Sequence, residues 1–204
     1  MRARTKRRLL GIDRSGPAPK PTLAGQPLNP FTIPNAIGLV RLALIPVFVA
    51  VAWSSGNGHS AAAAALFAVI GWADYLDGFT ARLTGQFSRL GTLLDPIIDR
   101  MLVVSGMVVA WHFSLLPRWA LAVMIVREIW MLFISRMALR RGIEIKISWL
   151  GRLGVAPTMA APFFAMLGVH WLALIMLYFG MALALSASVQ YMQRGLRELR
   201  KLSS

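Results

Sequence analysis

Residues 74–99 of this chain read DYLDGFTARLTGQFSRLGTLLDPIID, and they contain half of its acidic side chains. The chain has eight Asp and Glu residues in all, and four of them are Asp74, Asp77, Asp95 and Asp99. The surrounding sequence is hydrophobic, and an unpaired Asp at the centre of a membrane helix costs about 2.5–3.5 kcal/mol. A repeated cost of that size indicates a functional site, and a divalent metal site at the membrane is the simplest explanation.

The composition is typical of a polytopic helical membrane protein. The chain is 57% hydrophobic and only 15% charged, and apolar runs long enough to span a bilayer recur along it. It has no cysteine, which excludes disulfides and thiolate metal sites. The net charge is +14, but the cationic residues gather in the tails and in short loops beside apolar segments. That distribution indicates membrane topology and attraction to anionic lipid, and it argues against nucleic-acid binding.

The predicted fold is an all-α integral membrane protein with six transmembrane helices. Breaks rich in Gly, Pro and Ser separate the predicted helices, which cover residues 34–54, 60–83, 89–112, 117–139, 148–168 and 171–192. This transmembrane domain, residues 31–193, lies between a basic tail at 1–30, predicted to be disordered, and a second basic tail at 194–204. Lys and Arg concentrate in both tails, in the loop between the second and third predicted helices, and in the loop between the fourth and fifth. The positive-inside rule therefore predicts a protein of the cell membrane with both termini in the cytoplasm.

The spacing of the four Asp residues predicts that they converge. If the second and third helices form an antiparallel hairpin that turns near Gln86, Asp77 and Asp95 lie equally far from the turn, and Asp74 and Asp99 nearly so. Each pair is also spaced to share one helix face. The carboxylates are therefore expected to meet near the cytoplasmic face, where carboxylate ligands favour a hard cation such as Mg²⁺ or Mn²⁺, with room for two ions.

Two other interpretations remain open for these acidic residues. The Asp side chains could form a buried polar cluster with Arg82, Arg89 or Arg100, with no metal. They could also serve an intramembrane metal-ion transporter, since acidic residues inside membranes often line ion pathways. The clustering of the four near one face, together with Gly78 and Arg82 as partners for a phosphate, favours an enzyme over a transporter.

The same stretch resembles the signature of the CDP-alcohol phosphotransferases, which is D-x2-D-G-x2-A-R-x8-G-x3-D-x3-D. All eight fixed positions match with no insertion, and they are Asp74, Asp77, Gly78, Ala81, Arg82, Gly91, Asp95 and Asp99. The resemblance implies a homodimeric membrane enzyme of lipid synthesis that transfers a substituted phosphoryl group from a CDP-alcohol to a hydroxyl and releases CMP.

The resemblance also implies a role for each matching residue. The four Asp residues would bind the metal, and Asp99 would also act as the general base. Gly78, Ala81 and Arg82 would hold the CDP part of CDP-diacylglycerol. These roles agree with the chemistry, because metal ions offset the diphosphate charge while a carboxylate accepts the proton of the acceptor hydroxyl.

The acceptor is predicted from the amino-terminal part of the chain. Residues 34–46, PNAIGLVRLALIP, resemble the start of the phosphatidylglycerophosphate synthase branch, which favours sn-glycerol 3-phosphate as the acceptor. Arg127, Lys146 and Arg152 are candidate partners for the acceptor phosphate. The alternatives within the family are a cardiolipin synthase that uses phosphatidylglycerol and a phosphatidylinositol phosphate synthase. Arg41, in the same amino-terminal stretch, either faces the site or extends its side chain to the membrane interface.

Overall fold

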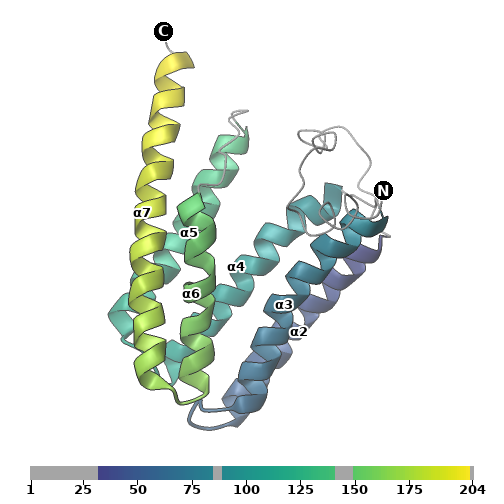
Figure 1. The fold of residues 1–204 in the computed structure, drawn as a ribbon, viewed down its shortest axis with the longest axis vertical. Coiled ribbons are helices and arrows are strands. Elements are labelled where there is room, and N and C mark those ends of the chain that lie inside the picture. Colours follow the sequence, from purple (N-terminus) through teal and green to yellow (C-terminus); the bar gives the residue numbers. More distant parts are fainter. Residues whose placement is uncertain (1–31, 85–88, 141–148, 203–204) are drawn as a thin grey trace, which may run out of the picture. The chain divides into compact units, whose positions relative to one another are not determined.

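The structure is a computed structural model, and it describes residues 32–84, 89–140 and 149–202. Within its helices, the side chains at 34, 75, 77–84, 89, 92–93, 135–140, 149–152 and 194–202 lie outside the description. The described residues form helices and no strands (Figure 1), and the helices are α2 (Ile33–Ser54), α3 (Ala61–Thr84), α4 (Arg89–His112), α5 (Arg118–Arg140), α6 (Trp149–Met166) and α7 (His170–Leu202).

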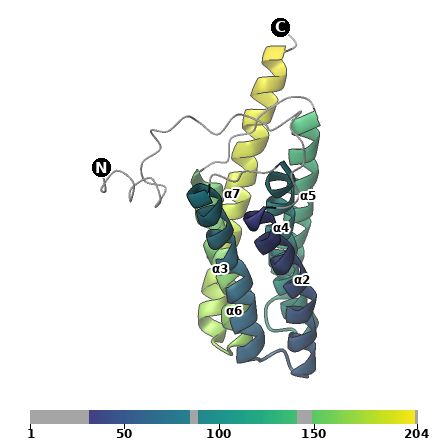
Figure 2. The ribbon, with the colours of Figure 1, turned by 90° about the vertical axis from the view of Figure 1, so that its right-hand side faces the viewer.

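These helices lie close to the six predicted segments. α4 begins and ends at the predicted residues 89 and 112, and the other starts differ by a single position. The clear difference is the end of α7, which continues to Leu202 and not to residue 192 (Figure 2). No proline follows residue 192 in the sequence, and a helix can continue into water after its apolar part ends. Polarity marks the edge of a membrane, but it does not stop a helix.

Two of the described helices are long and apolar enough to cross a membrane by length and composition, in the segments Asn35–Ser54 and His170–Gln193. Two shorter apolar segments are Ala61–Asp74 and Leu153–Met166. The acidic and basic residues of α3, α4 and α5 lower the hydropathy of those helices. The structure therefore supports an all-α protein with long apolar helices, while the count of six membrane spans remains a prediction.

The chain divides into two compact units. The first contains α2 up to Phe48, α3 from Leu66 and α4 up to Leu102. Its core includes Phe48 and Phe67, whose ring centroids are 5.2 Å apart. In the part of α2 that belongs to this unit, the buried positions recur every three or four residues, which is the spacing of one helix face, and they are Asn35, Gly38, Arg41, Ile45 and Phe48. The opposite face of α2 exposes large apolar side chains such as Leu39 and Val40, as expected for a helix that contacts lipid.

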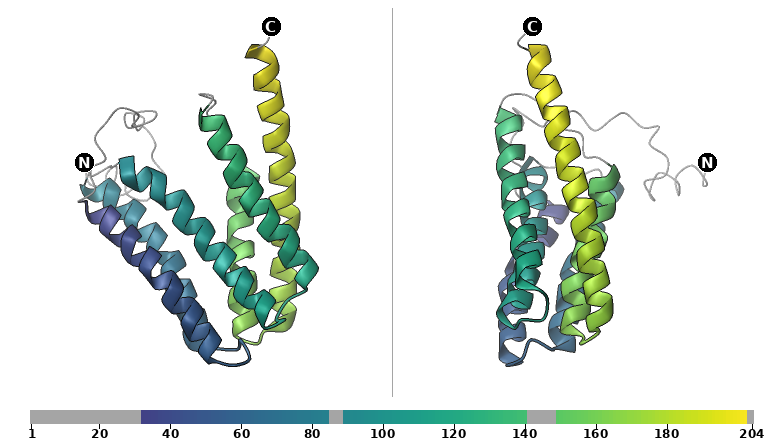
Figure 3. Two further views of the ribbon diagram at one scale, coloured as in Figure 1. Left: turned by 180° about the vertical axis from the view of Figure 1, so that it is seen from behind. Right: turned by 90° about the vertical axis from the view of Figure 1, so that its left-hand side faces the viewer.

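The second unit contains residues 49–65 and the chain from Val103 onward. Here α6 and α7 lie side by side and antiparallel (Figure 3). A methyl group added at Gly180 of α7 would lie 2.8 Å from Oγ1 and 2.9 Å from the backbone nitrogen of Thr158 on α6. The two backbones can approach this closely only because residue 180 has no side chain.

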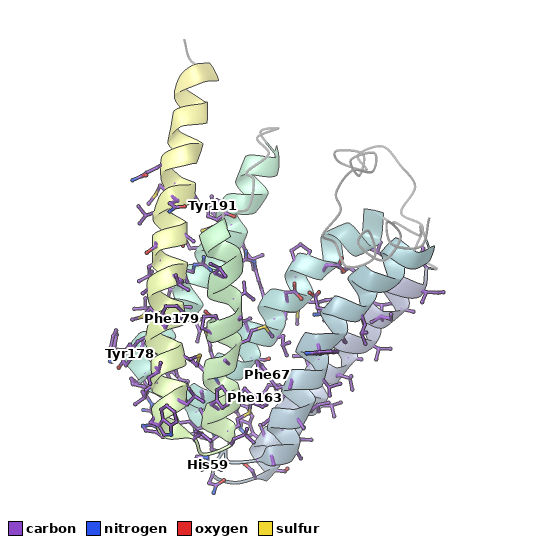
Figure 4. All side chains as sticks on the ribbon, in the orientation of Figure 1. His59, Phe67, Phe163, Tyr178, Phe179 and Tyr191 are labelled. Atoms are coloured by element: carbon purple, nitrogen blue, oxygen red, sulfur yellow. The ribbon has the colours of Figure 1, made fainter. Side chains whose placement is uncertain are left out.

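Aromatic side chains also join the helices of the second unit. The ring of Tyr178, labelled on α7 in Figure 4, is 6.0 Å from the ring of Trp119 at the start of α5. Trp53 packs against His112 and Phe113, with centroid distances of 4.7 and 5.7 Å. Trp53, His112 and Trp119 lie at the ends of helices, where aromatic rings with a polar atom are common in membrane proteins.

Candidate functional site

The acidic motif spans two helices of the first unit. Asp74 and Asp77 lie in the last part of α3, and Asp95 and Asp99 lie in the first half of α4. α3 also carries the other motif residues of its half, Gly78, Ala81 and Arg82. The side chains of Asp74, Asp95 and Asp99 are described, whereas those of Asp77, Ala81 and Arg82 are not.

Arg41 of α2 brings the two halves of the motif together. Its Nη1 donates a hydrogen bond to Oδ1 of Asp74 over 2.8 Å, and its Nη2 donates one to Oδ1 of Asp99 over 2.7 Å. Its Nε donates a third bond, over 3.0 Å, to the backbone carbonyl of Ile70 on α3. One planar guanidinium therefore joins α2 to α3 and α4. Both distances to the carboxylates are those of strong, charge-assisted hydrogen bonds.

Burial differs sharply between the arginine and the acids that it binds. The side chain of Arg41 is 1% exposed, whereas those of Asp74 and Asp99 are 44% and 47% exposed. The guanidinium thus lies behind the carboxylates, on the protein side. A carboxylate has a second oxygen and further lone pairs, so both acids can bind another group from their open side. Of the two positions considered for Arg41, facing the site and reaching the interface, the structure shows the first.

Asp95 lies beside the same face of α2. A methyl group added at Gly38 would be 4.0 Å from Oδ1 of Asp95 and 3.6 Å from Cδ1 of Ile98, both on α4. Gly38 is three positions before Arg41, so the two residues share a helix face. Buried Asn35, three positions earlier, continues that face. The motif alone did not point to Gly38 as a neighbour of Asp95, although its spacing from Arg41 carries that signal.

The four Asp residues of the motif have the chemistry of a divalent cation site, although the side chains that the structure describes do not form one. No three described His, Asp or Glu side chains are close enough together to hold a metal ion, and the side chain of Asp77 is not among those described. Four carboxylates and Arg41 leave three net negative charges, which suits one or two divalent cations. The oxygen ligands are those that Mg²⁺ and Mn²⁺ prefer. The metal role of the four Asp residues remains a prediction.

The three residues predicted to contact the acceptor phosphate are less completely described. Lys146 lies outside the described residues, and Arg152 lies in α6 with an undescribed side chain. Arg127 of α5 is 15% exposed and donates from Nε to Oγ of Ser188 over 2.9 Å. Its Nη2 donates to the carbonyl of Ala184 over 3.3 Å, and its Nη1 pairs with the adjacent Glu128. The structure thus places Arg127 against α7, inside the second unit.

Comparison with known proteins agrees with the motif. The family model described as CDP-alcohol phosphatidyltransferase matches residues 31–186. The chain belongs to this family. The matched region begins just before α2, so it includes the helix that carries Arg41 together with both halves of the acidic motif. Membership makes the protein a transferase whose relatives use a CDP-alcohol and an acceptor alcohol.

Individual relatives point to phospholipid synthesis. A protein of Mycobacterium tuberculosis named "Probable phosphatidylglycerophosphate synthase" is 30% identical over 172 residues, covering 81% of this chain and 82% of that protein. A CDP-diacylglycerol–glycerol-3-phosphate 3-phosphatidyltransferase of Shigella flexneri is 29% identical over 186 residues, covering 83% of this chain and 97% of that protein. A Mycobacterium bovis protein, provisionally named a cardiolipin synthase, is 40% identical over 98 residues, which is 48% of this chain and 46% of that protein.

Proposed function

We propose that this protein transfers the phosphatidyl group of CDP-diacylglycerol to a hydroxyl of sn-glycerol 3-phosphate and releases CMP. The observation that carries the proposal is the extent of the similarity. Relatives named for this reaction align with more than four fifths of the chain, whereas the relative named as a cardiolipin synthase aligns with about half. The complete acidic motif in α3 and α4 supports the chemistry.

In the proposed reaction, the oxygen of the acceptor hydroxyl attacks the phosphorus that carries the diacylglycerol group. The bond between that phosphorus and the CMP oxygen breaks, and CMP leaves with the electron pair. Asp99 accepts the proton of the attacking hydroxyl, and its half-exposed side chain is open to such a substrate. Gly78, Ala81 and Arg82 of α3 hold the CDP part, where a guanidinium suits diphosphate oxygens.

Asp74, Asp77, Asp95 and Asp99 would hold Mg²⁺ or Mn²⁺, as one or two ions. When bound, the metal offsets the charge on the diphosphate and on the leaving CMP. The support in the described residues is that Asp74 and Asp99 share one guanidinium and that Asp95 lies beside the same face of α2. Arg127, Lys146 and Arg152 are the proposed partners of the acceptor phosphate, because guanidinium and ammonium groups suit phosphomonoester oxygens.

The acceptor is tested with purified protein, labelled CDP-diacylglycerol, Mg²⁺ and a panel of acceptors. We expect CMP release and a phosphatidylglycerol phosphate product that saturate with glycerol 3-phosphate and require the metal. Changing Arg152 or Arg127 to Ala should raise the KM for glycerol 3-phosphate more than the KM for CDP-diacylglycerol. A protein that releases no CMP with glycerol 3-phosphate but forms cardiolipin from phosphatidylglycerol would contradict the acceptor assignment.

The second candidate function is cardiolipin synthesis from phosphatidylglycerol. One observation favours it, namely the higher identity of the shorter match, 40% over 98 residues. Phosphatidylglycerol enters sideways from the lipid and carries no phosphomonoester, so its use should not depend on Arg152. Myo-inositol phosphate would use the same cations as glycerol phosphate, and it belongs in the acceptor panel for that reason. Metal-driven ion flux into liposomes without CMP release would instead indicate a transporter.

We further propose that the protein is a homodimer in the cell membrane with six spans and both termini in the cytoplasm. The loop at Asn57 and the turn at Ser114 should then lie on the far side. Both side chains are exposed, so a thiol placed there can react with a reagent in water. Leu115, next to Ser114 in the same turn, is only 6% exposed and would not be a suitable position. The chain has no cysteine, so Asn57→Cys or Ser114→Cys gives a single thiol. An impermeant thiol reagent should label both from outside the cell, and labelling only from the cytoplasmic face would contradict this topology.

A further inference from the structure

We infer that Arg41 is a positioning residue for the transfer reaction. From α2, which lies outside the acidic motif, it fixes one oxygen each of Asp74 and Asp99 and so sets the direction in which both carboxylates present their second oxygen to the reacting groups. The inference rests on the proposed function for its chemistry, and on the contacts of Arg41 for its geometry.

The first argument is the direction of the side chain. An arginine in an apolar helix normally extends its charged group toward water, because burial of the charge is costly. Arg41 is 1% exposed and points inward, although its helix exposes Leu39 and Val40 on the opposite face. Burying the guanidinium is tolerable only where hydrogen bonds and opposite charges compensate for lost water, and here Asp74, Asp99 and the Ile70 carbonyl provide them.

The second argument is the rigidity of the contact. The guanidinium is planar, and its Nε, Nη1 and Nη2 each donate to a different residue. The Ile70 carbonyl belongs to the α3 backbone, so the bond from Nε anchors the plane to a helix. With the plane anchored, the two remaining nitrogens hold the two Oδ1 atoms in fixed directions. A lysine could neutralise one or both acids, but its flexible ammonium could not impose this arrangement.

The third argument is the position of the partners in the chain. Arg41 is 33 residues from Asp74 and 58 residues from Asp99. The two acids come from different halves of the motif and repel each other, and the cation behind them offsets that repulsion. Both acids keep their exposed side, at 44% and 47%, so the arginine holds them without covering them. An ion pair that only stabilised the helices would not need this arrangement.

The test compares Arg41→Gln and Arg41→Lys with the wild type, and uses Arg118→Gln as the matched loss of one positive charge. Arg118, the first residue of α5, is exposed and donates a hydrogen bond to Oγ of Ser114 in the second unit. Four quantities are measured: kcat and KM for CDP-diacylglycerol at saturating Mg²⁺, Mn²⁺ binding to substrate-free protein by electron paramagnetic resonance, and the unfolding temperature in detergent.

We expect Arg41→Gln to lower kcat by about 100-fold, as a small misplacement of a reacting group does, while KM for CDP-diacylglycerol changes far less. Mn²⁺ should bind at least as tightly as in the wild type, because a repelling cation near the site has been removed. Arg41→Lys should recover only part of kcat, because lysine restores the positive charge without the planar guanidinium that bonds both carboxylates. Arg118→Gln should match the wild type in kcat and in Mn²⁺ binding.

Two results would overturn the inference: a wild-type kcat in Arg41→Gln, or loss of Mn²⁺ binding from a folded Arg41→Gln protein, which would make Arg41 a residue that assembles the ligands. If Arg41→Gln does not fold, Arg41→Lys is the deciding variant. A wild-type kcat in Arg41→Lys would show that the two carboxylates need only a positive charge and not the planar guanidinium, and it would overturn the inference. The Mn²⁺ measurement needs no acceptor. A wild-type protein that fails to use glycerol 3-phosphate therefore contradicts the proposed acceptor and leaves the metal-binding test of Arg41 intact.

Discussion

Arg41 in the first unit and Arg127 in the second are both largely buried arginines in apolar helices, yet their partners differ. Arg41 bonds two acids that lie on two other helices, far along the chain. Arg127 pairs with Glu128, the next residue, and its other bonds go to Ser188 and Ala184 of α7. The acids bound by Arg41 are about half exposed, whereas Glu128 is 10% exposed.

This difference separates two uses of a buried cation. A buried arginine whose acid is its own neighbour is neutralised within one helix, and its remaining donors can hold a second helix in place. A buried arginine without such a neighbour must obtain its counter-charges from other helices, so it brings distant acids together. Where those distant acids also stay accessible, as Asp74 and Asp99 do, they and the arginine form a site. The predictions below test this contrast, from the largest expected effect to the smallest.

The largest effect is expected at the acid end of the Arg41 network. Asp99→Asn should lower turnover by about 10²–10⁴-fold, which is the usual contribution of a general base. The amide keeps the size of the side chain and can still accept a bond from Arg41, so the protein should remain folded. CMP release from CDP-diacylglycerol measures the turnover, and the unfolding temperature in detergent provides the control. Turnover close to that of the wild type would remove Asp99 from the role of base.

The next effect is expected in the packing of the second unit. Gly180→Ala should destabilise the protein by about 3 kcal/mol, because the new methyl group would overlap the backbone of Thr158 and helices cannot easily separate there. The matched control is Ala182→Gly, which removes a methyl group from an exposed position on the same helix. Unfolding by denaturant in detergent measures both. Equal stability of Gly180→Ala and the wild type would show that α6 and α7 are farther apart than the structure has them.

A smaller effect is expected on removing the second buried arginine. Arg127→Gln should cost about 1.5–2 kcal/mol of stability, since it removes charge-assisted bonds to α7 and the cation beside Glu128. The double variant with Glu128→Gln should regain part of the loss, because it also removes the buried negative charge. The same unfolding experiment measures all three proteins. A double variant less stable than Arg127→Gln alone would show that Glu128 has a more important partner than Arg127.

The smallest effect is expected at Gly38, the counterpart of Gly180 in the first unit. A methyl group there would lie at ordinary contact distances, 3.6 Å from Ile98 and 4.0 Å from Asp95. Gly38→Ala should therefore change stability by less than about 1 kcal/mol, with the helix preference of Ala in its favour. Denaturant unfolding beside Gly180→Ala compares the two glycines directly. A loss at Gly38 as large as that at Gly180 would mean that α2 approaches α4 more closely than the structure shows.

Local sequence patterns were sufficient to predict the helices and the residues that form the acidic pairs. Apolar runs and their Gly, Pro and Ser breaks placed α4 at residues 89–112 and the other starts within one position. The spacing of Asp74 and Asp99 about a turn predicted that they meet, and the structure places both on one guanidinium. The resemblance to the family was also visible in one contiguous stretch, because the motif lies within two helices that are adjacent in the sequence, and the family model matches residues 31–186. The metal itself and the roles of Lys146 and Arg152 remain predictions.

Only the tertiary structure decided which way the helices face. Arg41 could have reached for the interface, and the spacing of Gly38 and Arg41 along α2 shows only that they share a helix face, not which way that face points. Its direction depends on the rotation of α2 about its own axis, and in the structure Gly38 faces Ile98 of α4 while Phe48 packs against Phe67 of α3. The same holds for Arg127, which the structure places against α7. The sequence determined where each helix runs, because that depends on neighbouring residues. The structure determined what each helix presents to the site, because the partners of Arg41 lie 33 and 58 residues away.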